Sequence, residues 1–504
     1  MSAFITDQFR ILNAGSFVES ISNNSYYAFL GLSNPQATGF GRTDNWNSST
    51  SNNPVDNFQH LSHYRDTSLF GKKVTTENAR RVVRKVEWIA NNQYDMYRHD
   101  YGQYTNRNNV APVSKALKLY DANYYVITSD FKVYICIENG TSGVSPTVPR
   151  SSLEPTHTDV EPVSYSDGYV WKYLFKVAPS DIIKFDSTEF IVVPNDWATT
   201  TETDIQIIRD GGNSDTNENQ IKTIYIEEGG SNYSNLTHAI LGDGTGGEAS
   251  VTTTNGVITD VTVTKGGKGY TYGVVDLSAN SGSGAKLIPI IPPSKGHGYD
   301  VYTELGTDKV LLYARFDDST KDFPVDTKFA QVGILKNPET FSGAGTTFTG
   351  NAFSSLFAVG LSSTRTVTIG EEIRQNQGNN VTAKGYVASF DSETKILKYY
   401  QDRSLCFGNK VDQVENINTS GITTFNTSDI SFTQSGGVSQ VDTSLSGSVI
   451  TINAKQINLG VNFENGLANP EINKKTGDVI YIDNRPEVQR DSRQKEDVKI
   501  ILEF

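Results

Sequence analysis

Two strand patterns joined by a short turn constrain the fold of this chain more than any other stretch. Residues 124–128 and residues 131–138 are both rich in β-branched and aromatic side chains. Ser129 and Asp130, which separate the two runs, are residue types that favour turns. Two such runs with a short polar connection predict an antiparallel β-hairpin.

The strand pattern continues downstream of this hairpin. Residues 169–177 follow the turn-prone pair Asp167-Gly168 and alternate imperfectly between apolar and polar side chains, which predicts a third strand. Pro179-Ser180-Asp181 favours a short helical turn, and residues 190–194 predict a fourth strand that ends at a proline. We therefore expect one compact antiparallel sheet here, to which the rest of the chain is attached.

The same region carries a series of motifs in a distinctive order. They are Val133-Tyr134-Ile135-Cys136-Ile137-Glu138-Asn139, Ser145-Pro146-Thr147, Asp167-Gly168-Tyr169-Val170-Trp171-Lys172-Tyr173-Leu174 and Lys184-Phe185. This series resembles the baseplate wedge subunit of T-even-type contractile-tailed bacteriophages, the gene eight product. The resemblance extends over residues 26–194, 292–335 and 477–504, about half of the chain.

The resemblance implies a mainly β protein of several domains, one inserted into another, that forms a homodimer. It also implies large preformed surfaces that hold the other wedge subunits of the phage, and rigid-body movement when the baseplate rearranges on host contact. The chain is longer than the family pattern. The additional length lies in two regions: a small predicted β-barrel with an Asn/Ser/Thr-rich extension, within residues 364–465, and the glycine repeats described below.

Composition independently favours a β-rich protein of several domains. The 504 residues exceed one typical domain. Only 36% of the residues are apolar, but 25 Tyr and 24 Phe argue against a disordered chain, and 43 Gly imply many turns. The net charge of −13 and the lack of a basic stripe argue against a nucleic-acid partner.

An internal repeat predicts a small inserted β domain. Gly229-Gly230-Ser231-Asn232-Tyr233 recurs 37 positions later as Gly266-Gly267-Lys268-Gly269-Tyr270. Each copy continues through a short apolar segment into a second glycine turn, and Asn255-Gly256 between the copies is a strong hairpin signal. We expect two similar β units of about 35 residues each.

One helix is predicted between residues 75 and 91. Thr75 or Thr76 provides a cap, and Glu77 favours the first turn. Apolar residues then recur at helical spacing, namely Ala79, Val82, Val83 and Val86. The opposite side carries Arg80, Arg81, Arg84 and Lys85, which we interpret as a solvated face that meets acidic neighbours.

Together these patterns predict a mainly β (α+β) protein with several antiparallel sheets or sandwiches, inserted small β domains and few helices. We divide the chain into a core domain in three pieces (1–200, 293–363 and 466–504), a glycine-rich β-repeat domain (201–292) and a small β-barrel with decoration (364–465).

No motif for catalysis or cofactor binding is supported by the sequence that surrounds it. Gly242-x-Gly244-x-x-Gly247 matches a dinucleotide loop, but such a loop needs a helix directly after it, and residues 248–263 predict two strands instead. Six scattered histidines lack metal-ligand spacing, as do the distant Cys136 and Cys406. We therefore predict no enzyme activity, no cofactor and no metal site.

The function favoured by these observations is that of a structural virion protein, a baseplate wedge subunit of a contractile tail. Its expected partners are the other wedge subunits and a second copy of itself, with no nucleic acid and no membrane insertion, because no run approaches the ~18 apolar residues of a membrane helix. It is expected in the tail baseplate after assembly in the host cytoplasm. Candidate partner-interface residues are Trp46, which lies in the polar stretch 33–59, and the tyrosines Tyr270 and Tyr272.

Two alternatives remain open from the sequence. Repeated β modules with exposed aromatic residues such as Tyr270 and Tyr272 suit a receptor- or glycan-binding tail protein. A capsule-degrading hydrolase is a third hypothesis, because the two carboxylates of a glycosidase need no local motif.

Overall fold

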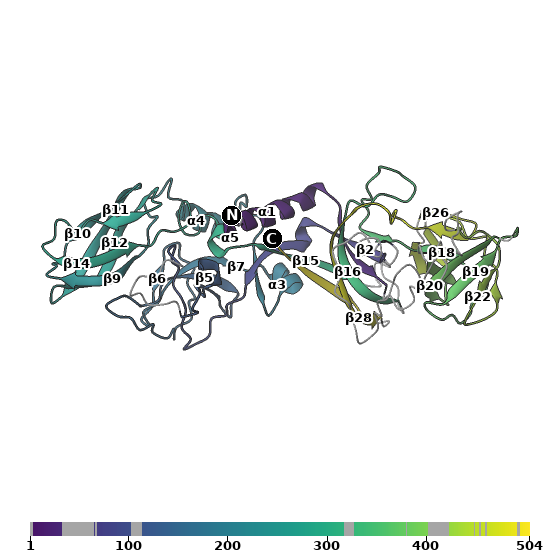
Figure 1. Ribbon diagram of the computed structural model, residues 1–504, viewed down its shortest axis with the longest axis horizontal. Coiled ribbons are helices and arrows are strands. Elements are labelled where there is room, and N and C mark those ends of the chain that lie inside the picture. Colours follow the sequence, from purple (N-terminus) through teal and green to yellow (C-terminus); the bar gives the residue numbers. More distant parts are fainter. Residues whose placement is uncertain are drawn as a thin grey trace. The chain divides into compact units, whose positions relative to one another are not determined.

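The fold is mainly β, as predicted, with 43% of residues in strands and 11% in helices. The computed structural model describes residues 4–32, 65, 68–101, 113–316, 327–379, 381–401, 423–447, 449–452, 455–458, 461–490 and 494–504. The chain folds as two compact units (Figure 1): residues 1–18, 80–311 and 501–504 form the first, and residues 19–79 and 312–500 form the second. The five-part domain division given above stays a prediction.

Four elements contain the boundaries between the units. They are α1 (Asp7–Asn23), β3 (Ala79–Arg84), β15 (Lys309–Phe316) and β29 (Glu496–Glu503). The other helices of the first unit are α3 (Pro179–Phe185), α4 (Thr203–Gly211) and α5 (Val301–Leu305). Its other strands are β4 (Tyr125–Ile127), β5 (Lys132–Glu138), β6 (Val163–Ser164), β7 (Val170–Lys176), β8 (Phe190–Val193), β9 (Ile224–Ser231), β10 (Thr237–Gly242), β11 (Thr245–Thr254), β12 (Val257–Lys268), β13 (Gly273–Val275) and β14 (Ser283–Pro289).

The predicted hairpin is present as β4 and β5, which pair antiparallel with Val126 opposite Tyr134. Strand β7 is the predicted third strand and pairs with the other edge of β5, placing Cys136 opposite Trp171. The sheet order is β4-β5-β7-β6. The fourth predicted strand, β8, does not join this sheet. It belongs to the sheet β29-β15-β3-β8, because the helix α3 turns the chain away after β7.

The prediction of a helix over residues 75–91 is wrong. Residues Thr76–Asn78 form one 3₁₀ turn, and the chain then becomes strand β3, which pairs with β8 through Val82 opposite Val192. Ala79, Val82 and Val83 are buried in this strand. The apolar spacing that suggested a helix also fits a strand that is covered on both faces, and the pairing with β8 decides between them.

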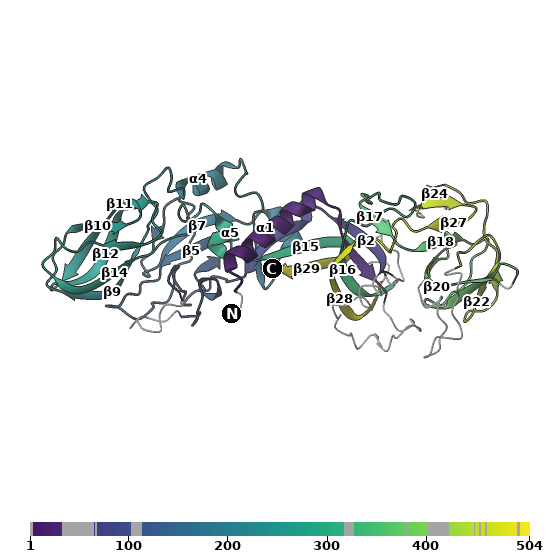
Figure 2. The same cartoon turned by 45° about the horizontal axis from the view of Figure 1, so that its top comes forward.

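The glycine repeats form one small domain of two sheets (Figures 1 and 2), which we call the repeat module. One sheet has the order β12-β11-β10-β13 and the other pairs β14 with β9. Both sheets contribute to one core, which includes Ile226, Tyr233, Ala249, Ile258, Tyr270 and Leu287. Asn255 and Gly256 both have positive φ and connect β11 to β12, which confirms the predicted hairpin.

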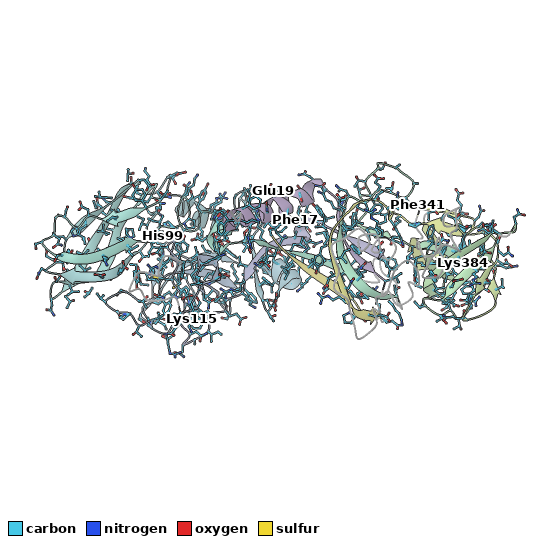
Figure 3. The ribbon with its side chains drawn as sticks, in the orientation of Figure 1. Phe17, Glu19, His99, Lys115, Phe341 and Lys384 are labelled. Atoms are coloured by element: carbon cyan, nitrogen blue, oxygen red, sulfur yellow. The ribbon has the colours of Figure 1, made fainter. Side chains whose placement is uncertain are left out.

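Specific contacts hold the repeat module against the rest of the first unit. The Gly143 N–H donates to Ile226 O at 2.6 Å, and a side chain at Gly143 would collide with the backbone of the neighbouring residue in β9. The Arg98 guanidinium lies 4.1 Å from the centre of the Tyr225 ring. At the end of the module, the Ile291 N–H donates to Nδ1 of His99 at 3.2 Å (Figure 3).

The described part of the second unit is mainly strand. Its strands besides the boundary elements are β1 (Tyr26–Gly31), β2 (Ser68–Val74), β16 (Lys328–Lys336), β17 (Ala352–Ser354), β18 (Phe357–Gly360), β19 (Glu372–Asn376), β20 (Thr382–Asp391), β21 (Ile396–Tyr400), β22 (Ile430–Phe432), β23 (Val438–Ser439), β24 (Val449–Ile452), β25 (Lys455–Asn458), β26 (Val461–Glu464), β27 (Leu467–Asn469) and β28 (Asp478–Gln489). One sheet has the order β17-β2-β1-β16-β28 and packs around Tyr27, Phe29 and Leu335.

The predicted barrel region forms an eight-stranded sheet. Its order is β23-β22-β19-β20-β21-β18-β27-β26, and within the described residues this order does not close into a ring. The strands β19, β20 and β21 are neighbours in this sheet. Their core is built from residues such as Ile373, Val387, Leu397 and Tyr399. Closure of these strands into a barrel stays a prediction.

In the part of the chain that the structure describes, no helix is both long enough and apolar enough to cross a membrane.

Candidate interaction surfaces

An aromatic cluster makes the sheet β4-β5-β7-β6 rigid. The Tyr169 and Trp171 rings stack with centres 5.6 Å apart, and Tyr94 meets Trp171 edge-on at 5.7 Å. The Tyr94 N–H donates to the Tyr169 hydroxyl, which itself donates to Pro149 O. Aromatic pairs of this kind add to the energy of burial. The loop before β6 is thus fixed to the sheet by both packing and hydrogen bonds.

A buried polar cluster fixes the segment by which the chain leaves the repeat module. His297 Nδ1 contacts the Glu304 carboxylate, and the second carboxylate oxygen accepts from the Gly298 N–H at 2.6 Å. Both side chains are buried, and the Tyr97 ring meets His297 edge-on at 4.7 Å. A buried charged group needs such partners, so the cluster allows few arrangements of this segment.

Lys172 in β7 lies near the same cluster. Its ammonium donates to Val160 O at 2.6 Å, and burial lowers the pKa of Lys172 to about 8. The negative charge of Glu304 acts in the opposite direction and partly offsets burial. Lys172 belongs to one of the family motifs quoted above, and its position between the sheet and residues 297–304 gives it a positioning role in the core.

Residues 126–231 match the family model Phage-Gp8, described as Bacteriophage T4, Gp8. The matched segment, which we call the Gp8-like segment, covers about a fifth of the chain. It contains β5, β6, β7 and β8 and ends with β9, so it includes Lys172 and the stacked pair Tyr169 and Trp171 of the aromatic cluster.

The match confirms the predicted resemblance over these residues. The Gp8-like segment indicates a structural protein of a phage tail baseplate. No protein among the curated sequences matches the chain.

Helix α1 presents an exposed apolar surface that the sequence reading missed. Phe9 and Leu12 are exposed on the helix, and Phe4 and Ile5 are exposed just before it. The opposite side of the helix is buried through Ile11, Ala14, Val18 and Ile21, whose spacing is helical. The Phe17 ring lies 5.4 Å from the Phe504 ring (Figure 3). The apolar spacing was the available signal, but the Ser and Asn residues of α1 weaken it.

A cleft of about 590 Å³ lies beside α1 in the first unit. Asp7 and Arg10 of α1 line it, together with Arg84 of β3. Lys309 also lines it and pairs with Asp308 and Glu503, at 2.8 and 3.2 Å. Acidic and basic groups are mixed along its walls, so the cleft selects for neither an anion nor a cation. We assign no chemistry to it.

The structure describes two of the three predicted interface residues and places them in different environments. Trp46 lies outside the described residues. Tyr270 was expected to be exposed, and this expectation is wrong, because the ring is only 2% exposed and belongs to the core of the repeat module. Tyr272 is 60% exposed and remains a predicted contact residue.

Tyr270 is buried because glycines make room for its ring. A Cβ at Gly244 would lie 2.4 Å from Cγ of Tyr270, and a Cβ at Gly267 would lie 2.6 Å from its Cε2. The hydroxyl donates to Ile240 O at 2.8 Å and accepts from the Gly247 N–H at 3.1 Å. The glycines of the repeat thus form a space for one ring, which we call a tyrosine slot.

The apparent dinucleotide motif is part of this slot. Gly242, Gly244 and Gly247 lie at the end of β10 and the beginning of β11, and residues 245–254 continue as strand. This confirms that no helix follows the motif. Among the described residues there is no group of three or more metal-ligating side chains. Cys136 is buried in β5, while Cys406, His60 and His63 lie outside the described residues.

Proposed function

We propose that this protein is a baseplate wedge subunit, which joins neighbouring wedge proteins of its phage and moves as a rigid body when the baseplate rearranges. The observation that carries the proposal is the match of residues 126–231 to Phage-Gp8. A homodimer and contacts to other wedge subunits are part of the proposal.

The core of the Gp8-like segment supports a scaffold role. Its side chains are held by stacked rings and by buried hydrogen bonds, as described for Trp171 and Lys172. A scaffold must transmit displacement without deforming, and close-packed interiors do so. The exposed apolar side chains of α1 provide a candidate contact for a neighbouring wedge subunit, because exposed apolar clusters mark interaction sites.

The proposal is tested by co-expressing this chain with the other wedge proteins of its own phage and measuring the mass of the purified complex. We expect a discrete complex that contains two copies of this chain. A chain that stays alone in solution with all wedge partners present would contradict the proposal.

A pair of variants tests the contact through α1. Phe9→Ser combined with Leu12→Ser removes two exposed apolar side chains and is expected to reduce recovery of the complex without changing the melting temperature of the isolated chain. Ile183→Ser is the matched control, because Ile183 is 79% exposed on the separate helix α3. Equal recovery with both variants would exclude α1 as the contact.

A further inference from the structure

One sheet of the repeat module carries an exposed apolar patch formed by Leu241, Tyr272 and Val274. Leu241 and Val274 are opposite each other in the pair β10–β13, and Tyr272 lies two residues before Val274. Their exposed fractions are 55%, 60% and 61%. The next cross-strand pair, Ile240 and Val275, faces the core and is buried. The patch is therefore the outward face of a strand pair whose inner face already supplies the core.

The neighbouring hairpin of the same sheet, β11–β12, has a solvated face of the usual polar kind. On β11 the exposed residues include Thr252 and Thr254, and on β12 they include Asp260, Thr262 and Thr264. These side chains are polar, as expected for a sheet that faces water on one side. The fold does not require apolar residues on this face, so the patch needs another explanation.

The first repeat provides an internal comparison for the same positions. When Tyr233 is aligned with Tyr270, Asn235 takes the place of Tyr272 and Thr237 takes the place of Val274. Asn235 Oδ1 accepts from the N–H and hydroxyl of Thr253, and the Thr237 and Ser250 hydroxyls share a 2.6 Å hydrogen bond. One repeat thus uses these positions for internal hydrogen bonds, and the other leaves an aromatic ring and an aliphatic side chain in water.

The size of the patch limits its occupant. Three side chains present on the order of 300 Å², comparable with the smallest functional apolar patches of monomers. A stable protein interface buries about 800 Å² on each partner. The patch alone is therefore too small for a second copy or a neighbouring subunit, and its size suits a small ligand with a flat apolar face.

The edge of the patch provides a hydrogen-bond acceptor. The Asp243 carboxylate accepts from the Thr271 N–H at 2.9 Å, from the Tyr272 N–H at 3.3 Å and from the Thr271 hydroxyl. The hydrogen bonds from Thr271 lower the pKa of the Asp243 carboxyl, so it is ionised at neutral pH. A carboxylate has about four acceptor positions, so one remains for a hydroxyl donor of a ligand.

We propose that the Leu241–Tyr272–Val274 patch binds an oligosaccharide of pyranose units with equatorial substituents. Sugars with equatorial substituents present flat C–H faces, which carry a small positive charge and stack on the negative face of an aromatic ring. Tyr272 supplies that ring, Leu241 and Val274 extend the apolar surface, and Asp243 accepts from a ring hydroxyl. This function goes beyond the scaffold role and does not depend on it.

The test uses saturation-transfer-difference NMR and calorimetric titration of the intact chain with two probes, chitohexaose and cellohexaose. We expect saturable binding of at least one probe. Tyr272→Asn and Val274→Thr, which introduce the residues of the first repeat, are expected to weaken it, Tyr272→Asn by about tenfold or roughly 1.4 kcal/mol. Both positions are exposed, so the variants should melt at the wild-type temperature.

Leu12→Ser on α1 is the matched control and should bind the probes as the wild type does. Absence of saturable binding to both probes would overturn the proposal, as would equal binding by wild type and Tyr272→Asn. A further outcome against it is a loss of the wedge complex, rather than of sugar binding, in the Tyr272 variant. Because sugar binding is measured on the purified chain and wedge joining on the complex, either proposal can fail without the other.

Discussion

The two repeats of the module are alike inside and different outside. Each places a tyrosine between two glycines: Tyr233 lies between Gly230 and Gly282, and Tyr270 lies between Gly267 and Gly244. Each also accepts a hydrogen bond at the tyrosine hydroxyl, from Ala285 in the first and from Gly247 in the second. Outside the core, the positions two and four residues after the tyrosine differ, with Asn235 and Thr237 in the first repeat and Tyr272 and Val274 in the second. The interior of a repeat is thus fixed by packing, and its surface is free to acquire another role.

Strand pairing also keeps the same geometry in both halves of the module while individual side chains differ. A bulge between Glu248 and Ala249 in β11 recurs between Lys286 and Leu287 in β14. The cross-strand ion pair beside each bulge also recurs, but with its charges exchanged. Glu248 lies opposite Lys265, whereas Lys286 lies opposite Glu228. The geometry requires a pair of opposite charges, not a particular residue on either strand.

The largest expected effect comes from emptying a tyrosine slot. Tyr233→Ala and Tyr270→Ala should each destabilise the module by about 3–5 kcal/mol, because the cavity between rigid glycines cannot collapse. Loss of amide hydrogen-exchange protection in β9 to β14 measures this. An effect at one tyrosine only would show that the two slots are not equivalent.

Filling a slot is expected to cost somewhat less. A Cβ at Gly244 or at Gly282 would lie 2.4 Å from the Cγ of its tyrosine, so Gly244→Ala and Gly282→Ala should each cost about 1–3 kcal/mol. Urea denaturation followed by exchange in the same strands tests this. Wild-type stability of both variants would contradict the close contact between glycine and ring.

Removing only the tyrosine hydroxyl groups should change the stability of the two repeats by different amounts. Tyr270→Phe deletes hydrogen bonds of 2.8 and 3.1 Å, whereas Tyr233→Phe deletes one of 3.4 Å. We expect a loss of about 1 kcal/mol or more at Tyr270 and a few tenths at Tyr233. Thermal melting of the two variants side by side is sufficient, and equal losses would contradict this difference.

The smallest effect is predicted for the exchanged ion pairs. Glu248→Lys should weaken the module slightly through repulsion from Lys265, and adding Lys265→Glu should restore stability to within about 0.5 kcal/mol. The double variant then carries the charge order of the Lys286–Glu228 pair. A double variant that remains as unstable as the single one would show that the individual residues matter.

The sequence predicted local features where neighbouring residues alone decide the structure. The hairpin β4–β5 and the Asn255-Gly256 turn were correct, because turn residues and alternating strands leave few alternatives. The glycine repeat was also recognised. Where partners far apart in sequence decide, prediction failed. Residues 79–84 had helical spacing but became a strand through β8, and α1 was missed because its buried face depends on packing.

The same distinction applies to the candidate contact residues. The internal repeat identifies Tyr270 and its glycines as parts of a shared sequence pattern. It does not show that the ring lies in a slot, because Gly244 and Gly267 come together only in the folded sheet. Tyr272 is two residues away and is exposed, although positions two apart on a strand would share a face, because both tyrosines lie in the connection between β12 and β13. The sequence by itself determined the β class, the repeat and the resemblance to a baseplate protein. The tertiary structure alone decided which tyrosine belongs to the core and which one faces solvent, because burial depends on long-range packing.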